Sequence, residues 1–250
     1  MERKEQKKMQ SYIAVDLETT GLSPVENEII EIGAVLVEDG KVKETFSELV
    51  KPSVMIPAKI TEITGIDDTM TADKKPVSEV LERFLAFAGE RPLLGHNLKF
   101  DYSFLKVNGE KIGKRINSTG MDTLKIAKQV LPELSSRSLA SLCEYYHVEN
   151  ECAHRAYEDA KATAEIFEKM KKQFQTAFPE AFKPQQMQYK IKKQEPITIK
   201  QKKYLLDLLK YHKIKIETIL EEDAVSIDEL TKSKASKLID YIILHYGRMY

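Results

Sequence analysis

Asp16 and Glu18 are the first side chains in the sequence with the chemistry and the separation needed for metal binding or catalysis. They follow the apolar residues 12–15 and precede a turn at residues 19–21, which places them at the end of an expected buried strand. Side chains two positions apart in a strand project from the same face. Two adjacent carboxylates repel unless cations neutralise them, and hard divalent cations prefer oxygen ligands. The pair therefore indicates a metal site, although such pairs are also typical of plain surface charge.

A third acid, Asp101, follows a second point where a strand is expected to end. The residues before it, Gly95-His-Asn-Leu-Lys-Phe, mark a change from strand to helix, which is the usual place for a ligand-binding crevice in α/β sheets. An acid in the first turn of a helix is also favourable to the helix dipole alone. Asp101 is therefore a candidate for the same site, with a helix-stabilising role as the alternative.

His154 and Asp159 lie at the start of another expected helix. The small residues at 160–164 allow this helix to approach a sheet closely, and His154 precedes the helix, where it can reach the same cleft. A lone histidine is more often a structural or surface residue than a base. Its significance depends on the acids that accompany it.

The elements that must position these side chains alternate in type. Strands are expected over residues 11–17 and 29–37, with a hairpin at Asp39-Gly40 leading into a strand over residues 41–50. Pro76 opens a helix with one apolar face, and residues 92–95 form a short buried strand before another helix. Further helices are expected near residues 122–130, 136–146 and 156–178. The pattern predicts a mixed α/β domain whose sheet is covered by helices.

Composition narrows the class of protein. The 250 residues are 42% hydrophobic and 31% charged, which argues against wholesale disorder and fibrous classes. No stretch approaches the ~20 apolar residues of a membrane span, and the charged residues 1–10 are not followed by the apolar segment of a signal peptide. Two cysteines are too few for a disulfide framework or a four-cysteine zinc site. We therefore expect a cytoplasmic protein with no membrane partner.

The charge changes sign along the chain. Residues 1–182 carry 25 basic and 30 acidic groups, a net charge of −5, whereas residues 183–250 carry 14 and 9, a net charge of +5. Three prolines bracket the polar residues 179–196, which predicts a linker. Two stretches of helical periodicity follow and predict a small helical module over residues 197–250. The chain thus divides into a charged N-terminal extension (1–10), a main domain (11–178), the linker and the module.

Three motifs in this order closely resemble those of the DEDDh 3′→5′ exonucleases. They are Asp16-x-Glu18-Thr-Thr-Gly, Gly95-His-Asn-x-x-Phe-Asp101 and His154-x-x-x-x-Asp159. The nearest resemblance is to the proofreading exonuclease of bacterial DNA polymerase III, in its epsilon-subunit and PolC-type forms. Further similarity at residues 60–66, 121–124 and 138–142 extends it over about residues 11–175. The tyrosine-type relatives carry Tyr where this chain has Arg155, so the histidine form is the one present.

The resemblance implies a ribonuclease-H-like fold, a mixed sheet flanked by helices, and phosphodiester cleavage with two divalent cations, Mg²⁺ or Mn²⁺. Asp16 would bridge both cations. Glu18 and Asp159 would complete the site of the cation that carries the attacking water, and Asp101 would hold the second cation. His154 would act as the general base, because the pKa of imidazole lies near neutrality.

The resemblance also implies how the end of a strand is held. Leu17 and Thr19 would contact the terminal nucleotide together with His154, and His96, Asn97 and Phe100 would shape its pocket. Phe100 is equally typical of simple core. The expected substrate is the 3′ end of single-stranded DNA, from which nucleoside 5′-monophosphates are released in replication proofreading or repair.

Several alternatives remain open. The same motifs serve RNA-processing exoribonucleases, and a non-catalytic nucleic-acid-binding adaptor would keep the fold without the activity. The C-terminal module has lysines near the start of each helix, which suits nucleic acid. Docking to a polymerase or helicase, or an inert helical unit, explains the module as well.

Overall fold

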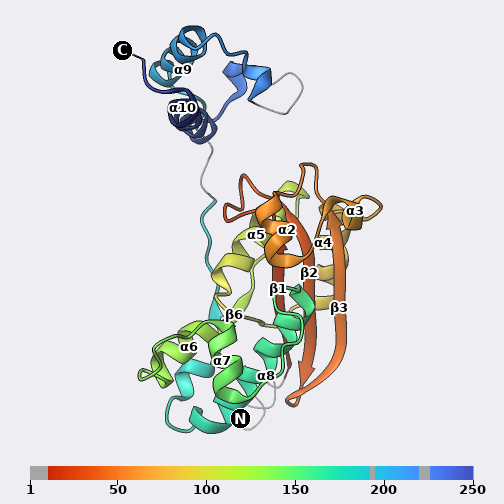
Figure 1. The fold of residues 1–250 in the computed structure, drawn as a ribbon. Helices are drawn as coiled ribbons and strands as arrows, with labels where there is room; N and C mark the ends of the chain where they lie inside the picture. The colour runs from red at the N-terminus through yellow and green to blue at the C-terminus, as the bar shows by residue number, and fades with distance from the viewer. Residues whose placement is uncertain (1–10, 192–194, 220–225, 250) are drawn as a thin grey trace. The chain divides into compact units, whose positions relative to one another are not determined.

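A computed structural model describes residues 11–191, 195–219 and 226–249 (Figure 1). The charged extension predicted over residues 1–10 lies outside the described residues. The chain forms two compact units, Met1–Ile191 and Lys192–Tyr250, which we call unit 1 and unit 2. No helix among the described residues is both long enough and apolar enough to cross a membrane.

Unit 1 is built on a seven-stranded mixed sheet in the order β4-β3-β2-β1-β5-β6-β7. Strands β1, β2 and β3 form an antiparallel meander, and β5 and β6 run parallel to β1. The strands are β1 (Ser11–Thr19), β2 (Ile29–Glu38), β3 (Lys41–Lys51), β4 (Lys75–Pro76), β5 (Leu93–Gly95), β6 (Thr119–Asp122) and β7 (Gln185–Gln186).

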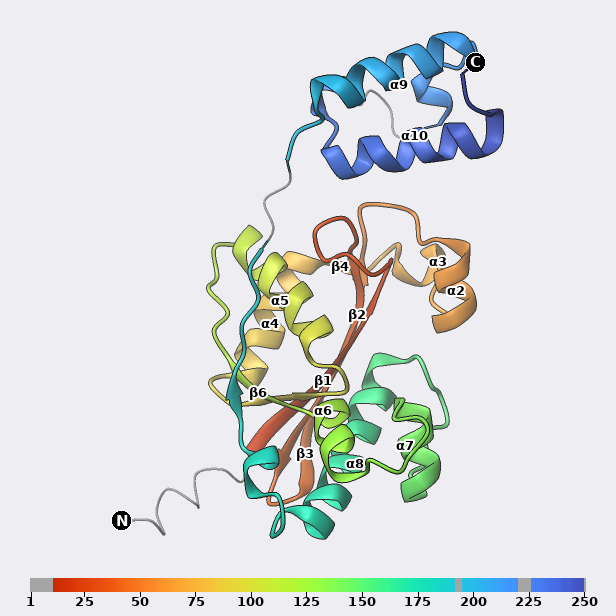
Figure 2. The same cartoon turned by 90° about the vertical axis from the view of Figure 1, so that its left-hand side faces the viewer.

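Helices cover both faces of this sheet (Figures 1 and 2). The helices of unit 1 are α2 (Ala58–Thr64), α3 (Asp68–Thr71), α4 (Val77–Ala88), α5 (Lys99–Lys111), α6 (Thr123–Val130), α7 (Leu139–Tyr146) and α8 (Ala156–Phe174), with a 3₁₀ turn η2 (Pro179–Phe182). One core cluster joins the sheet to α4 and α5, and another joins it to α6, α7 and α8. The predicted mixed α/β fold with covering helices is therefore confirmed.

Alternation along β1 decides where the acids point. Ile13, Val15 and Leu17 pack in the cluster with α4 and α5, whereas Tyr12 and Ala14 pack in the cluster with α8. Because side chains alternate along a strand, Asp16 and Glu18 share the face of Tyr12 and Ala14. The sheet therefore directs both carboxylates toward the face that α8 covers.

The structure differs from the sequence prediction at residues 179–191. The pattern there predicted the first part of a linker, but Phe182 of η2 is buried in the α6–α8 cluster and β7 pairs antiparallel with β6. Phe182, the partly buried Met187 and Tyr189, and the open edge of the sheet hold this segment in unit 1. These contacts come from residues distant in sequence, which a proline-based boundary does not detect.

Unit 2 contains the two predicted helices, α9 (Ile199–Tyr211) and α10 (Lys232–Tyr246), with 3₁₀ turns η3 (Ile216–Thr218) and η4 (Ile227–Glu229). The segments that enter the two helices are joined by the bridge between Pro196 and Thr231. The buried apolar residues of its small core, among those described, are Leu205, Leu208, Leu209, Leu230, Ala235, Leu238 and Ile242.

Candidate active site

The end of β1 forms the floor of the site. Asp16 lies opposite Gly33 of β2 and Glu18 lies opposite Glu31, and the register then shifts between Glu18 and Thr19. A bulge of this kind ends regular pairing and re-aims the side chains beside it. The strand therefore presents Asp16 and Glu18 where the regular ladder ends.

Gly33 allows α8 to approach this floor. A Cβ at Gly33 would lie 2.1 Å from the carbonyl carbon of Ala156 and 2.1 Å from the backbone nitrogen of Tyr157. No side chain fits there, because the first turn of α8 rests directly on the backbone of β2. This contact brings Asp159, which lies in the same first turn of α8, to the acids of β1 and leaves it only 7% exposed.

Asp101 reaches the same place from α5. Its Oδ1 accepts a hydrogen bond from the backbone nitrogen of Leu17 at 3.1 Å, and its side chain is 3% exposed. Burial raises the pKa of Asp101 to about 8, although the N–H groups of Asp101 and Leu17 act in the opposite direction. Asp101 is thus joined to the strand that carries Asp16 and Glu18, and a helix-dipole role alone does not account for its position.

The turn before α8 holds His154 over the acids. Asp159 accepts hydrogen bonds from the Asn150 side chain at 2.6 Å and from the backbone nitrogen of His154 at 3.1 Å. His154 has a φ of +65°, an uncommon backbone conformation for a residue with a side chain, and its imidazole is exposed. Ligand atoms of Glu18, His154 and Asp159 lie within 4.8 Å of one another. This three-residue group does not include Asp16 or Asp101.

One acid that supports the site, Glu31, was not predicted from the sequence. Glu31 is 1% exposed, and it accepts hydrogen bonds from Arg155 Nη2 at 2.7 Å, Arg155 Nε at 3.2 Å and the backbone nitrogen of Ala156 at 3.0 Å. It therefore fixes the first residue of α8 beside its strand neighbour Glu18. The signal was present, because Glu31 is a lone acid inside the apolar run of β2.

Burial has the largest influence on the acids of this cluster, and repulsion between them adds to it. Burial, followed by the charges of Asp101, Asp159 and Glu18, raises the pKa of Asp16 well above its usual range. Burial and the charge of Asp159 raise the pKa of Glu18 to about 8, and burial raises the pKa of Asp159. Four carboxyls in one place require either protons or cations. Carboxylate oxygens with one imidazole nearby match the donor preferences of a hard divalent cation, so the residues fit such an ion.

The residues predicted to hold a nucleotide lie around the β1 and β5 ends. Leu17 and Thr19 are buried, and the Thr19 hydroxyl donates to the Gly21 carbonyl at 2.7 Å. Asn97 is exposed with a φ of +65°, and its backbone nitrogen donates to Asp122 at 3.1 Å.

The other two pocket candidates, His96 and Phe100, have partners within unit 1. The Nδ1 atom of His96 lies 2.9 Å from the Thr123 hydroxyl. Phe100 is half-buried against the α4–α5 cluster, with its ring centroid 5.0 Å from that of Phe104. Phe100 is therefore at least partly core, as the alternative interpretation held.

The relatives of this chain among known proteins are an exonuclease family and DNA polymerase III proteins. A family model described as exonuclease, RNase T, matches residues 13–167. A PolC-type DNA polymerase III from Caldanaerobacter subterraneus subsp. tengcongensis is 43% identical over 164 residues, which are 66% of this chain and 12% of that protein. The DNA polymerase III epsilon subunit of Aquifex aeolicus is 38% identical over 161 residues, 64% of this chain and 80% of that subunit. The chain thus spans only about an eighth of the PolC-type relatives it matches.

Solved structures show the same fold. Exonuclease X in complex with 5′ overhanging duplex DNA is 26% identical with a TM-score of 0.56, covering 65% of this chain and 92% of that one. Escherichia coli Exonuclease I in complex with a dT13 oligonucleotide has a TM-score of 0.59 at 21% identity, covering 69% of this chain and 42% of that one.

Proposed function

This chain belongs to the exonuclease family RNase T, and from that premise we propose that it releases nucleoside 5′-monophosphates from the 3′ end of single-stranded DNA in replication proofreading or repair. The observation that carries the proposal is the cluster of Asp16, Glu18, Asp101 and Asp159, which β1, α5 and α8 bring together beneath an exposed histidine. An acidic cluster of this kind suits chemistry on a phosphodiester only when cations are held there.

The four acids would hold two divalent cations, Mg²⁺ or Mn²⁺. When bound, the cations supply positive charge that stabilises the phosphate as it is attacked and that lowers the pKa of water. The elevated pKa values of Asp16, Glu18 and Asp101 support this assignment, since cations and protons compete for the same carboxylates.

His154 would accept the proton of the attacking water at an imidazole nitrogen. Its exposed side chain gives it access to water, and its backbone hydrogen bond to Asp159 keeps it beside the acids. Glu31 and Arg155 would act as positioning residues, because their ion pair fixes the turn that carries the histidine.

The strand end would be held by residues around the same edge of the sheet. Leu17 and Thr19 would contact the terminal nucleotide, since both lie in β1 beside the acids. His96, Asn97 and Phe100 would form its pocket, and the exposed Asn97 side chain is the one most open to a ligand.

A polymerase is the proposed protein partner. The relatives with 43% and 38% identity are named as a DNA polymerase III and as one of its subunits. A cytoplasmic site of action follows from the same replication role, and a helicase is the alternative partner.

The test is a time course on 5′-labelled single-stranded DNA with Mg²⁺, Mn²⁺ or EDTA, run beside Asp16→Asn and a matched RNA strand. A metal-dependent ladder that shortens from the 3′ end, absent in the variant, is expected. Faster cleavage of RNA would reassign the chain as an exoribonuclease. No cleavage of either strand by a folded protein that binds both the cation and the strand would favour the adaptor.

A further inference from the structure

One side of α10 presents basic and aromatic side chains to solvent. Lys234, Lys237, Tyr241 and His245 are spaced by three or four residues, which places them on one side of the helix, and all four are exposed. Leu244, three residues beyond Tyr241, is 81% exposed. We call Lys234, Lys237, Tyr241, Leu244 and His245 the α10 face. Within α10, every residue of which is described, the one acid is Asp240, about 100° around the helix from Tyr241.

The two rings of this face are already stacked. The centroids of Tyr241 and His245 lie 4.1 Å apart with an angle of 29° between the ring planes. The His245 Nδ1 lies 2.9 Å from the Tyr241 carbonyl oxygen, which fixes the orientation of the imidazole. A pair held in this way loses little conformational freedom when a further flat ring stacks on it. Exposed aromatic rings beside lysines are the features that bind bases and phosphates of single strands.

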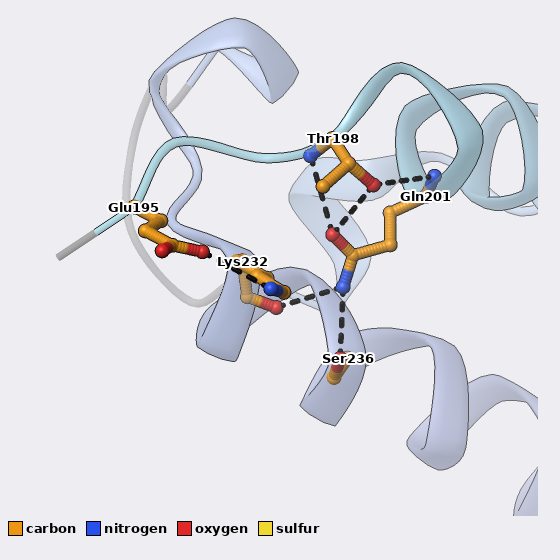
Figure 3. Close-up of polar contacts among 5 residues, drawn as sticks. All are labelled: Glu195, Thr198, Gln201, Lys232 and Ser236. Carbon is orange, nitrogen blue, oxygen red and sulfur yellow. Dashed lines mark hydrogen bonds and ion pairs between the residues drawn. The ribbon is translucent and has the colours of Figure 1, made fainter.

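The helix beneath these rings is firmly placed within unit 2. Gln201 of α9 bridges the two helix starts, as Figure 3 shows: its Nε2 donates to the Lys232 carbonyl at 3.0 Å and to the Ser236 hydroxyl at 2.9 Å. The same side-chain amide accepts hydrogen bonds from the backbone and hydroxyl of Thr198. Ala235, Leu238 and Ile242 are buried on the adjoining side of α10, centred about 100° around the helix from the α10 face. The α10 face is therefore displayed on a packed helix.

Charge indicates what this face binds. A phosphodiester strand is a polyanion, yet residues 1–182 carry a net charge of −5 and the candidate active site concentrates four acids. Residues 183–250 carry a net charge of +5. Without bound cations the acidic site repels the strand, and exposed lysines elsewhere in the chain supply attraction through phosphate contacts.

We infer that the α10 face binds single-stranded nucleic acid, with Lys234 and Lys237 against backbone phosphates and bases stacked on the Tyr241–His245 pair. The inference rests on the proposed function for its choice of substrate and adds a second contact for that substrate, in unit 2. Stacking and phosphate contacts are common to DNA and RNA, so the face itself accepts both.

The test measures binding by the full chain in EDTA, so that cleavage does not interfere. Fluorescence anisotropy with long labelled oligothymidine and oligouridine is compared for Lys234→Gln/Lys237→Gln, Tyr241→Ala and Tyr241→Phe. The lysine variant is expected to bind about tenfold more weakly, and the slope of log affinity against log salt to fall by about 1.4, the value for two single-strand phosphate contacts. Tyr241→Ala is expected to lose about fivefold or more, while Tyr241→Phe retains affinity because it keeps the ring.

The matched control is Lys203→Gln/Lys210→Gln, which removes the same charge from exposed positions on α9. Equal losses in the two lysine variants, or unchanged affinity in Tyr241→Ala, would overturn the inference. Cleavage of a short oligonucleotide with Mg²⁺ is measured in parallel and is expected to be unaffected by α10 variants. A chain that binds through α10 without cleaving contradicts only the proposed function, and one that cleaves without using α10 contradicts only this inference.

Discussion

The active-site cluster of unit 1 and the α10 face of unit 2 both collect charges of one sign, but they do so at different depths. Asp101 and Asp159 are 3% and 7% exposed, and the cluster that they share with Asp16 and Glu18 has raised pKa values. Lys234 and Lys237 are exposed, where a charge costs little. Buried carboxylates close to one another are stable only when cations or protons neutralise them. Exposed lysines are stable without a ligand and attract an anionic one. The first arrangement suits chemistry and the second suits capture.

The largest expected effect is the loss of cleavage in Asp16→Asn. Removing the acid at the centre of the cluster should lower turnover by about 10³-fold or more, because charge on the phosphate is then poorly stabilised. The folded protein should become more stable in EDTA, since one source of repulsion is gone. Activity and thermal melting are measured beside Asp39→Asn, an exposed acid of the β2–β3 turn. Full activity in Asp16→Asn would remove the two-cation assignment.

His154→Ala should reduce turnover by about 10²-fold, the lower range for loss of a general base. Cation affinity, measured by calorimetry, should change much less, because the four acids remain. If the variant instead loses the cations but regains normal turnover when they are supplied in excess, His154 is a ligand and not the base.

Glu31→Gln should lower turnover by about tenfold, the range for groups that position metal ligands. The substitution weakens the bonds to Arg155 and Ala156 that fix the start of α8. Glu48→Gln is the control, since Glu48 of β3 lies in the same sheet but pairs with Arg83 of α4, outside the acidic cluster. A positioning role predicts that kcat falls with little change in KM for a short strand; equal effects of the two variants on kcat would refute it.

Two truncations separate the units. Removing residues 192–250 should preserve cleavage of short strands and weaken binding of long ones by about tenfold, because the phosphate contacts of α10 are lost. Removing residues 183–250 also deletes β7 and the bond from the Met187 nitrogen to the Ser118 carbonyl. That chain should be less stable by a further 1–3 kcal/mol or so in urea unfolding. Equal stabilities would show that residues 183–191 contribute nothing to unit 1.

The smallest expected effect is a pH dependence of stability without cations. The carboxyls of Glu18 and Asp101 have a folded pKa of about 8, above the usual values of 4.5 and 3.8. Between these limits the folded state holds more protons than the unfolded state, so stability falls as pH rises from about 4 to about 8. In EDTA, Glu18→Gln should reduce this fall, raising the melting temperature of unit 1 at pH 8 by about 2–4 °C. Stability that rises over this range in both proteins would contradict the arrangement of the acids.

Local sequence patterns predicted the features of the structure that depend on residues close together in the chain. The i, i+2 spacing of Asp16 and Glu18 predicts a shared face, and β1 has that alternation. The motif order likewise predicted the family, because side chains that perform one kind of chemistry recur in fixed order. Helices α6, α7 and α8 lie where periodicity predicted them, within a few residues at their ends.

Local sequence patterns did not predict the features that depend on contacts between residues far apart in the chain. From the sequence, Asp101 could be either a metal ligand or an acid that only stabilises its helix. The hydrogen bond from the Leu17 nitrogen, a contact between residues distant in sequence, places it beside β1. The boundary of the linker likewise depends on a long-range contact, because β7 forms by pairing with the free edge of β6. The proposed catalytic roles remain predictions that the variants above examine.

The sequence thus establishes which side chains are available and which face of their own element each occupies, because those depend on helix and strand periodicity. The tertiary structure alone brings Asp159 to Asp16 across more than 140 residues of chain. It does so through Gly33, whose missing side chain lets α8 rest on β2. Burial and mutual repulsion raise the pKa of the acids, and both arise only after that packing has removed water and brought the carboxyls together.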